Sequence, residues 1–331
     1  MLTDIKKFFK IFMGDDKMIL KKLFSALISL LIVILMTSAV FAENKLPEGV
    51  EPLTWQPSPQ NLAIKTDEAR KLYEKIRSYR YPSMKELKNS PVVAQLDALS
   101  KYYIEKYGNT AEINTPERQE LREKVLKEFL STGSARKISE EKYAFQSKYA
   151  FDGELKRNYQ MTLVLGLPAV GKSTVYTNPH SEQTGAFILD CDDIKKLLPE
   201  YKESYGGAAD AVHFESLELM DKAMEIFLTG EMKGVNVILP IVATDFDELM
   251  NKYIKPFEAA GYNVQAVFID AAENISFGQN IARQLDSGRV FRSSVAASFG
   301  KKPKNVYNRL KNLKNSKGKK YGMEMLKFQK H

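Results

Sequence analysis

The sequence predicts an α/β protein in which a parallel β-sheet lies between layers of helices and follows an all-helical N-terminal region. Four short apolar runs between residues 161 and 269 alternate with segments of helical periodicity, which is the pattern of parallel strands joined by helical crossovers. Before residue 159, helix-capping residues and apolar stripes at helical spacing follow one another. The chain has 331 residues, 44% hydrophobic and 27% charged, which is a globular composition with length for two or three domains.

Residues 1–42 have the pattern of an export signal. Two lysines, Lys21 and Lys22, precede an almost wholly apolar run over 23–41 that ends in Val-Phe-Ala42. This is typical of a secretory signal peptide cleaved after Ala42, although the run is also just long enough to span a bilayer uncleaved. We therefore expect residue 43 onward to lie outside the cytosol, periplasmic, secreted or anchored in the inner membrane, with membrane contact only through 23–41. If the signal is not used, the expected location is the cytoplasm.

Residues 43–65 are polar and contain four prolines, which predicts a linker. The all-helical region is expected over 66–158. Its helix starts and stops are marked by Thr66, Ser90-Pro91, Gly108 and Thr115-Pro116, and a fourth helix is expected over 139–150. No set of chemically reactive side chains stands out here, so the apolar stripes are interpreted as core-facing helix surfaces.

The first apolar run, over 161–165, leads directly into Gly-Leu-Pro-Ala-Val-Gly-Lys-Ser, the G-x-x-x-x-G-K-[ST] spacing of a P-loop. In such a loop the backbone N–H groups close around phosphate oxygens, and the following helix directs its positive end at the same anion. Lys172 would reach the β- and γ-phosphates, and Ser173 would ligate Mg²⁺. We therefore predict ATP and Mg²⁺ as cofactors. The predicted nucleotide-binding residues are Gly166, Leu167, Pro168, Ala169, Val170, Gly171, Lys172, Ser173 and Thr174.

Three further apolar runs complete the predicted sheet. They occupy residues 186–189, 235–239 and 264–269. A segment of helical spacing over 209–230 and another ending near Gly261 lie between them. Together with the P-loop, this order predicts a three-layer P-loop kinase fold over residues 159–300.

The second candidate site is the acidic sequence Asp190-Cys191-Asp192-Asp193, which directly follows the second predicted strand. Open α/β sheets bind ligands at this edge. A carboxylate beside the γ-phosphate can orient a substrate hydroxyl, accept its proton and help to hold Mg²⁺. We predict Asp192 as the catalytic and metal-binding carboxylate. A structural role is an equal alternative for Asp190 and Asp193, and Asp192 or Asp193 would otherwise cap a helix beginning at Ile194.

These motifs resemble the zeta-toxin family of P-loop kinases. The resemblance covers about residues 159–300. It rests on the P-loop, the run over 189–201, the sequence His213-Phe-Glu215-Ser216 and the strand over 234–239. It implies ATP-dependent phosphorylation of a sugar-nucleotide hydroxyl, such as that of a UDP-N-acetyl sugar, with a possible antitoxin as partner. It also implies that Asp192 is the base, while Lys172 and Ser173 serve the nucleotide and Mg²⁺.

Arg283 and Arg289 are similar to the arginines that cover the phosphates in that family. Independently of the family, guanidinium groups stabilise the negative charge that phosphoryl transfer spreads over oxygens, and Gly288 between them suits a moving lid. A solvated helix face is the alternative for both arginines. Glu215 resembles the family's acidic substrate residue. After the third strand, where the family usually has a polar residue, then glycine and threonine, only Thr244 is available to hold substrate.

The charge of the chain is unevenly distributed. Its net value is +8, and residues 301–331 alone contain eleven Lys and Arg residues against one acid, Glu324. We predict a basic, solvated C-terminal tail over 301–331 with an amphipathic piece at 306–313, and do not expect it to bind nucleic acid. The single cysteine, Cys191, excludes an intramolecular disulfide and a multi-cysteine metal site.

Two other functions remain open at this point. One is a P-loop kinase that acts on a nucleic-acid 5′ end or on another small molecule, in which case the basic tail would follow phosphates. The other is a non-catalytic, membrane-associated module that binds nucleotide and has lost phosphoryl transfer.

Overall fold

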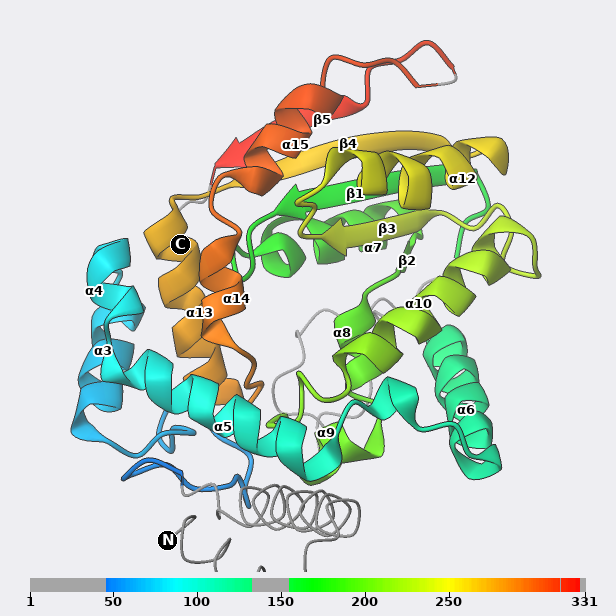
Figure 1. Cartoon of the computed structure of the whole chain (residues 1–331). Helices are drawn as coiled ribbons and strands as arrows, with labels where there is room; N and C mark the ends of the chain where they lie inside the picture. Colours follow the sequence, from blue (N-terminus) through cyan, green and yellow to red (C-terminus); the bar gives the residue numbers. More distant parts are fainter. Residues whose placement is uncertain (1–45, 133–154, 316, 328–331) are drawn as a thin grey trace, which may run out of the picture. The chain divides into compact units, whose positions relative to one another are not determined.

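The computed structural model describes residues 46–132, 155–315 and 317–327 (Figure 1). The expected export signal over 1–42 and the expected helix over 139–150 lie outside the described residues. Within them, no helix combines the length and the apolar character that a membrane crossing requires.

The core of the fold is a parallel sheet with the strand order β2-β3-β1-β4-β5. Its strands are β1 (Gln160–Gly166), β2 (Phe187–Ile188), β3 (Val237–Ile241), β4 (Asn263–Asp270) and β5 (Gly322–Lys327). The first four confirm the predicted strands. Because all strands run in one direction, the segments that follow β1, β2 and β3 meet at the same edge of the sheet. This topology places the P-loop and the acidic sequence next to each other.

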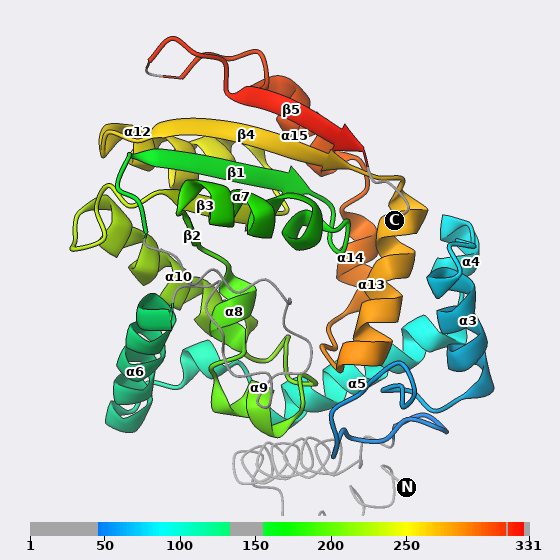
Figure 2. The same cartoon turned by 180° about the vertical axis from the view of Figure 1, so that it is seen from behind.

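Helices cover both faces of the sheet (Figures 1 and 2). Those after β1 are η2 (Lys172–Thr177, a π-helix), α7 (Asn178–Thr184), α8 (Cys191–Lys195), α9 (Pro199–Glu203), α10 (His213–Leu228), α11 (Phe246–Glu248), η3 (Leu249–Ile254, also a π-helix), α12 (Lys255–Ala259), α13 (Glu273–Ser287), α14 (Ser293–Ser298) and α15 (Lys302–Leu310). The two views, from opposite sides, show α12 and α15 over one face and α7 over the other. Alternate residues of β1 follow this division. Met161 and Leu163 face the larger core, the apolar cluster that contains residues of α10, α12 and α15. Val164 faces the smaller core, an apolar cluster with Ile238 and Val267.

The C-terminal segment is part of this sheet, and the expected solvated tail over 301–331 is therefore wrong. Strand β5 pairs in parallel with β4, whose outer edge would otherwise be unpaired. Helix α15 buries Val306, Tyr307 and Leu310 in the larger core, where the Tyr307 ring stacks on Phe268 with 5.2 Å between centroids. The amphipathic piece is real, but its apolar side packs against the sheet. The sheet consequently extends beyond residue 300.

The all-helical N-terminal region is confirmed over residues 67–132. It consists of α3 (Asp67–Arg77), α4 (Met84–Lys88), α5 (Pro91–Tyr107), the 3₁₀ helix η1 (Thr110–Glu112) and α6 (Pro116–Thr132). The predicted caps are present: the Thr66 hydroxyl accepts from the Ala69 N–H at 3.2 Å, and the Ser90 hydroxyl accepts from the Val92 N–H at 3.3 Å. Such caps satisfy backbone donors that the helix itself leaves free.

The segment expected to be a linker, over 43–65, is instead packed where it is described. Leu62, Ala63 and Ile64 are buried in one cluster with residues of α3, α5 and α13. The Ala63 N–H also donates to the carbonyl of Leu285 at 2.7 Å. The apolar residues that follow Pro59 explain the difference, because they have enough surface to bury in the cluster that contains α13.

Candidate active site

The P-loop connects β1 to η2 in a tight turn. Gly166 ends the strand with φ +154°, and a Cβ at this position would lie 2.8 Å from the carbonyl oxygen of Ile269. The loop therefore requires glycine here, because β4 approaches the backbone too closely for any side chain. Ser173 and Thr174 are exposed at the start of η2. The hydroxyl of Ser173 is thus accessible, as a ligand for Mg²⁺ must be.

Lys172 folds back over the loop. Its Nζ donates hydrogen bonds to the carbonyl oxygens of Gly166 at 3.0 Å and Leu167 at 2.8 Å. Burial lowers the pKa of Lys172 to about 8, although the nearby Asp190 and Asp192 oppose the shift. The ammonium group is therefore held by neutral carbonyl groups, which a phosphate can replace with a stronger, charge-assisted interaction.

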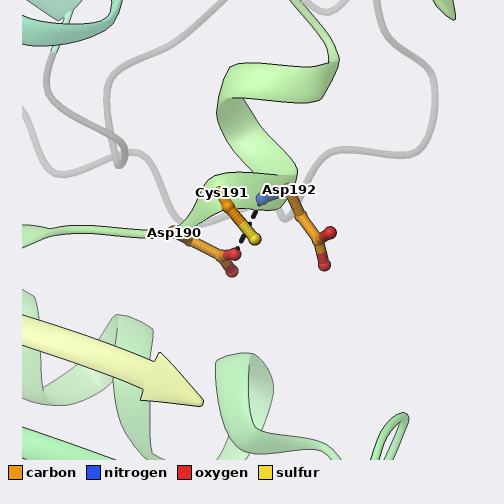
Figure 3. Close-up of side chains that lie close together, drawn as sticks. All are labelled: Asp190, Cys191 and Asp192. Carbon is orange, nitrogen blue, oxygen red and sulfur yellow. Dashed lines mark hydrogen bonds between the residues drawn. The ribbon is translucent and has the colours of Figure 1, made fainter. Parts of the chain in front are cut away.

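Asp190, Cys191 and Asp192 gather at the start of α8 (Figure 3), with their potential ligand atoms within 4.8 Å of one another. The Asp190 carboxylate accepts from the Asp192 N–H at 2.9 Å and so caps α8. The helix begins at Cys191, which corrects the expectation that Asp192 or Asp193 caps a helix beginning at Ile194. Burial, with the charge of Asp192 close by, raises the pKa of Asp190 to about 7.

Asp192 is paired with two cations. Its Oδ1 lies 2.5 Å from Nη2 of Arg289 and 3.2 Å from Nζ of Lys195, one turn along α8. Burial alone would raise the pKa of Asp192, but these cations outweigh it and hold the pKa below its usual range. Asp192 is thus ionised at neutral pH. This is the state that a metal ligand or a general base requires.

The Arg289 guanidinium has hydrogen-bond donors that no described residue accepts from. Its side chain is 12% exposed, and its Nε and Nη1 are buried without a hydrogen-bond partner among the described residues. Unsatisfied buried donors of this kind are uncommon and point to a missing acceptor. An oxyanion such as a phosphate fits, since a guanidinium binds it through two parallel hydrogen bonds. The donor set of Lys172, Ser173, Asp192 and Arg289 therefore suits a Mg²⁺–nucleotide.

The remaining predicted site residues are placed differently. Arg283 is exposed on α13 and is not part of the Asp192–Arg289 pair, while Thr244 is half-buried in the loop after β3. Asp193 pairs with Lys196 at 2.6 Å. Burial lowers the pKa of His213 to about 4, which is consistent with a neutral, packed histidine.

Glu215 is not brought to the site. It is fully buried in α10, where Arg118 and Arg122 of α6 hold its carboxylate, with Arg122 Nε at 2.7 Å. Arg118 also pairs with Glu200 of α9 at 2.6 Å. The expectation that Glu215 binds substrate is corrected by this arrangement, because both of its oxygens are already occupied. The two arginines that pair with Glu215 lie nearly 100 residues earlier in the chain. No local sequence pattern indicates this pairing.

We expect Glu215→Gln to destabilise the protein by about 3–5 kcal/mol, since it leaves the Arg122 guanidinium without a carboxylate and Arg118 with Glu200 alone. Urea unfolding measures the change. The matched control is Asp221→Asn, which breaks an exposed pair with Lys252 (47% and 34% exposed) and should cost at most about 1 kcal/mol. A small change in stability together with a large loss of substrate binding would restore the substrate role.

The difference in unfolding free energy between the parent and Glu215→Gln should depend on pH. Burial raises the pKa of Glu215, but hydrogen bonds from Arg118, Thr110 and Arg122 outweigh burial and lower it. A carboxyl whose pKa is lower in the folded state stabilises the fold above its unfolded pKa of about 4.3 and loses that effect as the pH falls. The difference between parent and Glu215→Gln should therefore shrink below about pH 4.

A cleft of about 920 Å³ adjoins the P-loop. Leu167 of the loop, Asp270 at the end of β4, and Asn305 and Asn308 of α15 are among the residues that line it. It lies next to the phosphate-binding loop and is large enough for a small organic ligand.

The chain is similar to known proteins over its P-loop region. A family model described as "AAA domain" matches residues 161–298. No curated protein matches the sequence. A solved structure from a study of the PezAT chromosomal toxin–antitoxin system of Streptococcus pneumoniae matches with a TM-score of 0.38 and 17% identity, over 51% of this chain and 63% of that one. Residues 161–298, which contain the P-loop, thus form a P-loop domain.

Proposed function

We propose that the protein is an ATP- and Mg²⁺-dependent kinase that transfers the γ-phosphate to a hydroxyl group of a small molecule. The observation that carries the proposal is the meeting of an ionised Asp192 with Arg289, 2.5 Å apart, at the sheet edge that bears the P-loop. A carboxylate and a guanidinium at that edge are the two groups that phosphoryl transfer needs beyond the nucleotide site.

The residues would act as follows. Lys172 leaves the carbonyl oxygens of Gly166 and Leu167 for phosphate oxygens, and Arg289 turns its free donors to the same charge. Ser173 and Asp192 would hold Mg²⁺, which would neutralise phosphate charge, and ATP would supply the phosphoryl group and leave as ADP. Asp192, relieved of Arg289, orients the acceptor hydroxyl and takes its proton. The cleft lined by Leu167 and Asn305 would hold the nucleoside.

For the acceptor we propose a sugar nucleotide of the UDP-N-acetyl type. The support is the resemblance of the P-loop, the Asp190–Asp193 sequence and the following helix to zeta toxins. The same resemblance is our reason to include an antitoxin among the expected partners. Glu215 cannot contribute to sugar recognition in this structure, because it is buried with two arginines.

The test is a transfer assay with the purified chain, Mg²⁺, ATP labelled on the γ-phosphate, and a panel of acceptors analysed by mass spectrometry. We expect label on a UDP-N-acetyl sugar and none on UDP, which has the ribose hydroxyls but lacks those of the N-acetyl sugar. Transfer to a nucleic-acid 5′ end or to another hydroxyl compound would contradict the proposed acceptor and retain the kinase. Tight ATP binding with no transfer to any acceptor would contradict the kinase and favour a non-catalytic module.

A further inference from the structure

The segment that carries Arg289 is tied to the N-terminal helical region. Ser293 follows Arg289 by four residues, and its N–H donates to Oδ1 of Asp97 on α5 at 2.5 Å. Asp97 also accepts from Ser294. The carboxylate therefore fixes the first turn of α14, directly after the arginine segment, from a helix about 200 residues earlier in the chain.

A second carboxylate, Asp210, holds the same segment at the preceding residue. Oδ2 of Asp210 accepts from the backbone N–H of Arg292 at 2.8 Å and from its Nε at 3.3 Å. The hydroxyl of Ser100, also on α5, donates to this oxygen at 2.7 Å. One acceptor thus joins α5, the loop before α10 and the arginine segment. In this arrangement Asp97 and Asp210 contact residues on both sides of the turn into α14.

The backbone around Arg289 is also closely packed. The Val290 N–H donates to the carbonyl of Gly206 at 3.3 Å, and a Cβ on Gly288 would lie 2.4 Å from the carbonyl oxygen of Tyr205. The arginine segment, residues 288–293, therefore lies against the loop over 205–210. This contact and the two carboxylates fix the position of the backbone at Arg289, from which the side chain extends.

We propose that Asp97 and Asp210 are positioning residues that hold Arg289 in reach of Asp192, so that the N-terminal helical region completes the candidate active site. The catalytic part of this inference rests on the proposed function; the structural part does not. Arg289 needs this support because, among the described residues, its side chain has one carboxylate partner, Asp192, and two nitrogen donors without an acceptor. A loop that moved by about 1 Å would lose the short contact, and displacements of that size cost about 10²-fold in rate.

The experiment is a double-mutant cycle on the full chain between Asp97→Ala and Arg289→Gln, measured by the unfolding equilibrium. In the parent, Arg289→Gln should raise the unfolding equilibrium constant about tenfold. In the Asp97→Ala background the same substitution should raise it by less than about twofold, because the displaced arginine no longer contacts Asp192. Asp97→Asn keeps an oxygen for the Ser293 N–H and should restore most of the difference. Should Asp97→Ala fail to fold, Asp210→Ala takes its place in the cycle, because it removes the acceptor for the Arg292 N–H and should likewise reduce the effect of Arg289→Gln to less than about twofold.

The matched control is Ser90→Ala, which removes the N-cap of the same helix α5 without contacting the arginine segment. It should lower stability and leave the full effect of Arg289→Gln unchanged. Additive effects of Asp97→Ala and Arg289→Gln would overturn the proposal, because Asp97 would then only stabilise the fold.

Phosphoryl transfer supplies the second measurement. Asp97→Ala should slow single-turnover transfer about 10²-fold and change ATP affinity by less than about threefold, since the P-loop is untouched. Full transfer in this variant would also overturn the proposal. If the parent transfers to no acceptor while the unfolding cycle is non-additive, the proposed function fails and the positioning role stands.

Discussion

Replacing Lys172 by alanine is expected to weaken Mg²⁺–ATP binding by about 10²-fold or more while the domain stays folded. Among the described residues, the Lys172 ammonium donates hydrogen bonds to two neutral loop carbonyls, so its removal leaves no described carboxylate without its hydrogen-bonded cation. With nucleotide bound, the same group would contact the β- and γ-phosphates, where no other lysine is placed by the P-loop.

Calorimetric titration of parent and variant with Mg²⁺–ATP measures the effect, and circular dichroism checks the fold. Lys222→Ala on the exposed side of α10 is the control for a general loss of positive charge. Equal affinity for ATP in Lys172→Ala and the parent would reject the P-loop as a nucleotide site in this chain.

Replacing Asp192 by asparagine is expected to slow single-turnover phosphoryl transfer by about 10²- to 10⁴-fold, the usual effect of removing a general base. ATP affinity should be largely retained, because Lys172 and the loop hold the phosphates without Asp192. Asparagine keeps the shape of the side chain but neither accepts the proton nor pairs with Arg289 as an anion.

Two neighbouring carboxylates provide the controls. Asp190→Asn preserves the cap of α8, since asparagine caps as well as aspartate, and Asp193→Asn breaks only the pair with Lys196, at a cost of about 1 kcal/mol. Both should retain most of the transfer rate. If Asp190→Asn or Asp193→Asn abolishes transfer while Asp192→Asn does not, the catalytic carboxylate is the neighbour.

The features that the sequence predicted well are those decided by short-range chemistry. The P-loop spacing, the caps at Thr66 and Ser90, and the four apolar runs each depend on residues within one element or turn. They need no knowledge of the rest of the chain. The placement of Asp192 followed as well, because parallel strands bring their ends to one edge.

What the sequence did not predict depends on distant partners. Glu215 carries a charge that is typical of a binding site, and Arg118 and Arg122, more than 90 residues away, make it structural. The basic composition of 301–331 hid an edge strand, since alternation in β5 is weak and the pairing partner β4 lies some 50 residues earlier. Three nearby aspartates could cap α8, and the helix begins at Cys191, shortly after β2 ends at Ile188, so Asp190 is the cap.

The packing of the N-terminal segment on α13 has a consequence for how the chain acquires its fold. Tyr73 of α3 bonds to Asp286 of α13, and the two are 213 residues apart. During synthesis the apolar faces of α3 and α5 emerge long before the helix that covers them. Contacts between residues so distant in sequence slow folding, and until they form, apolar surface that is prone to aggregation stays exposed. We expect the nascent N-terminal helices to need a chaperone, or to stay uncollapsed, until α13 has left the ribosome.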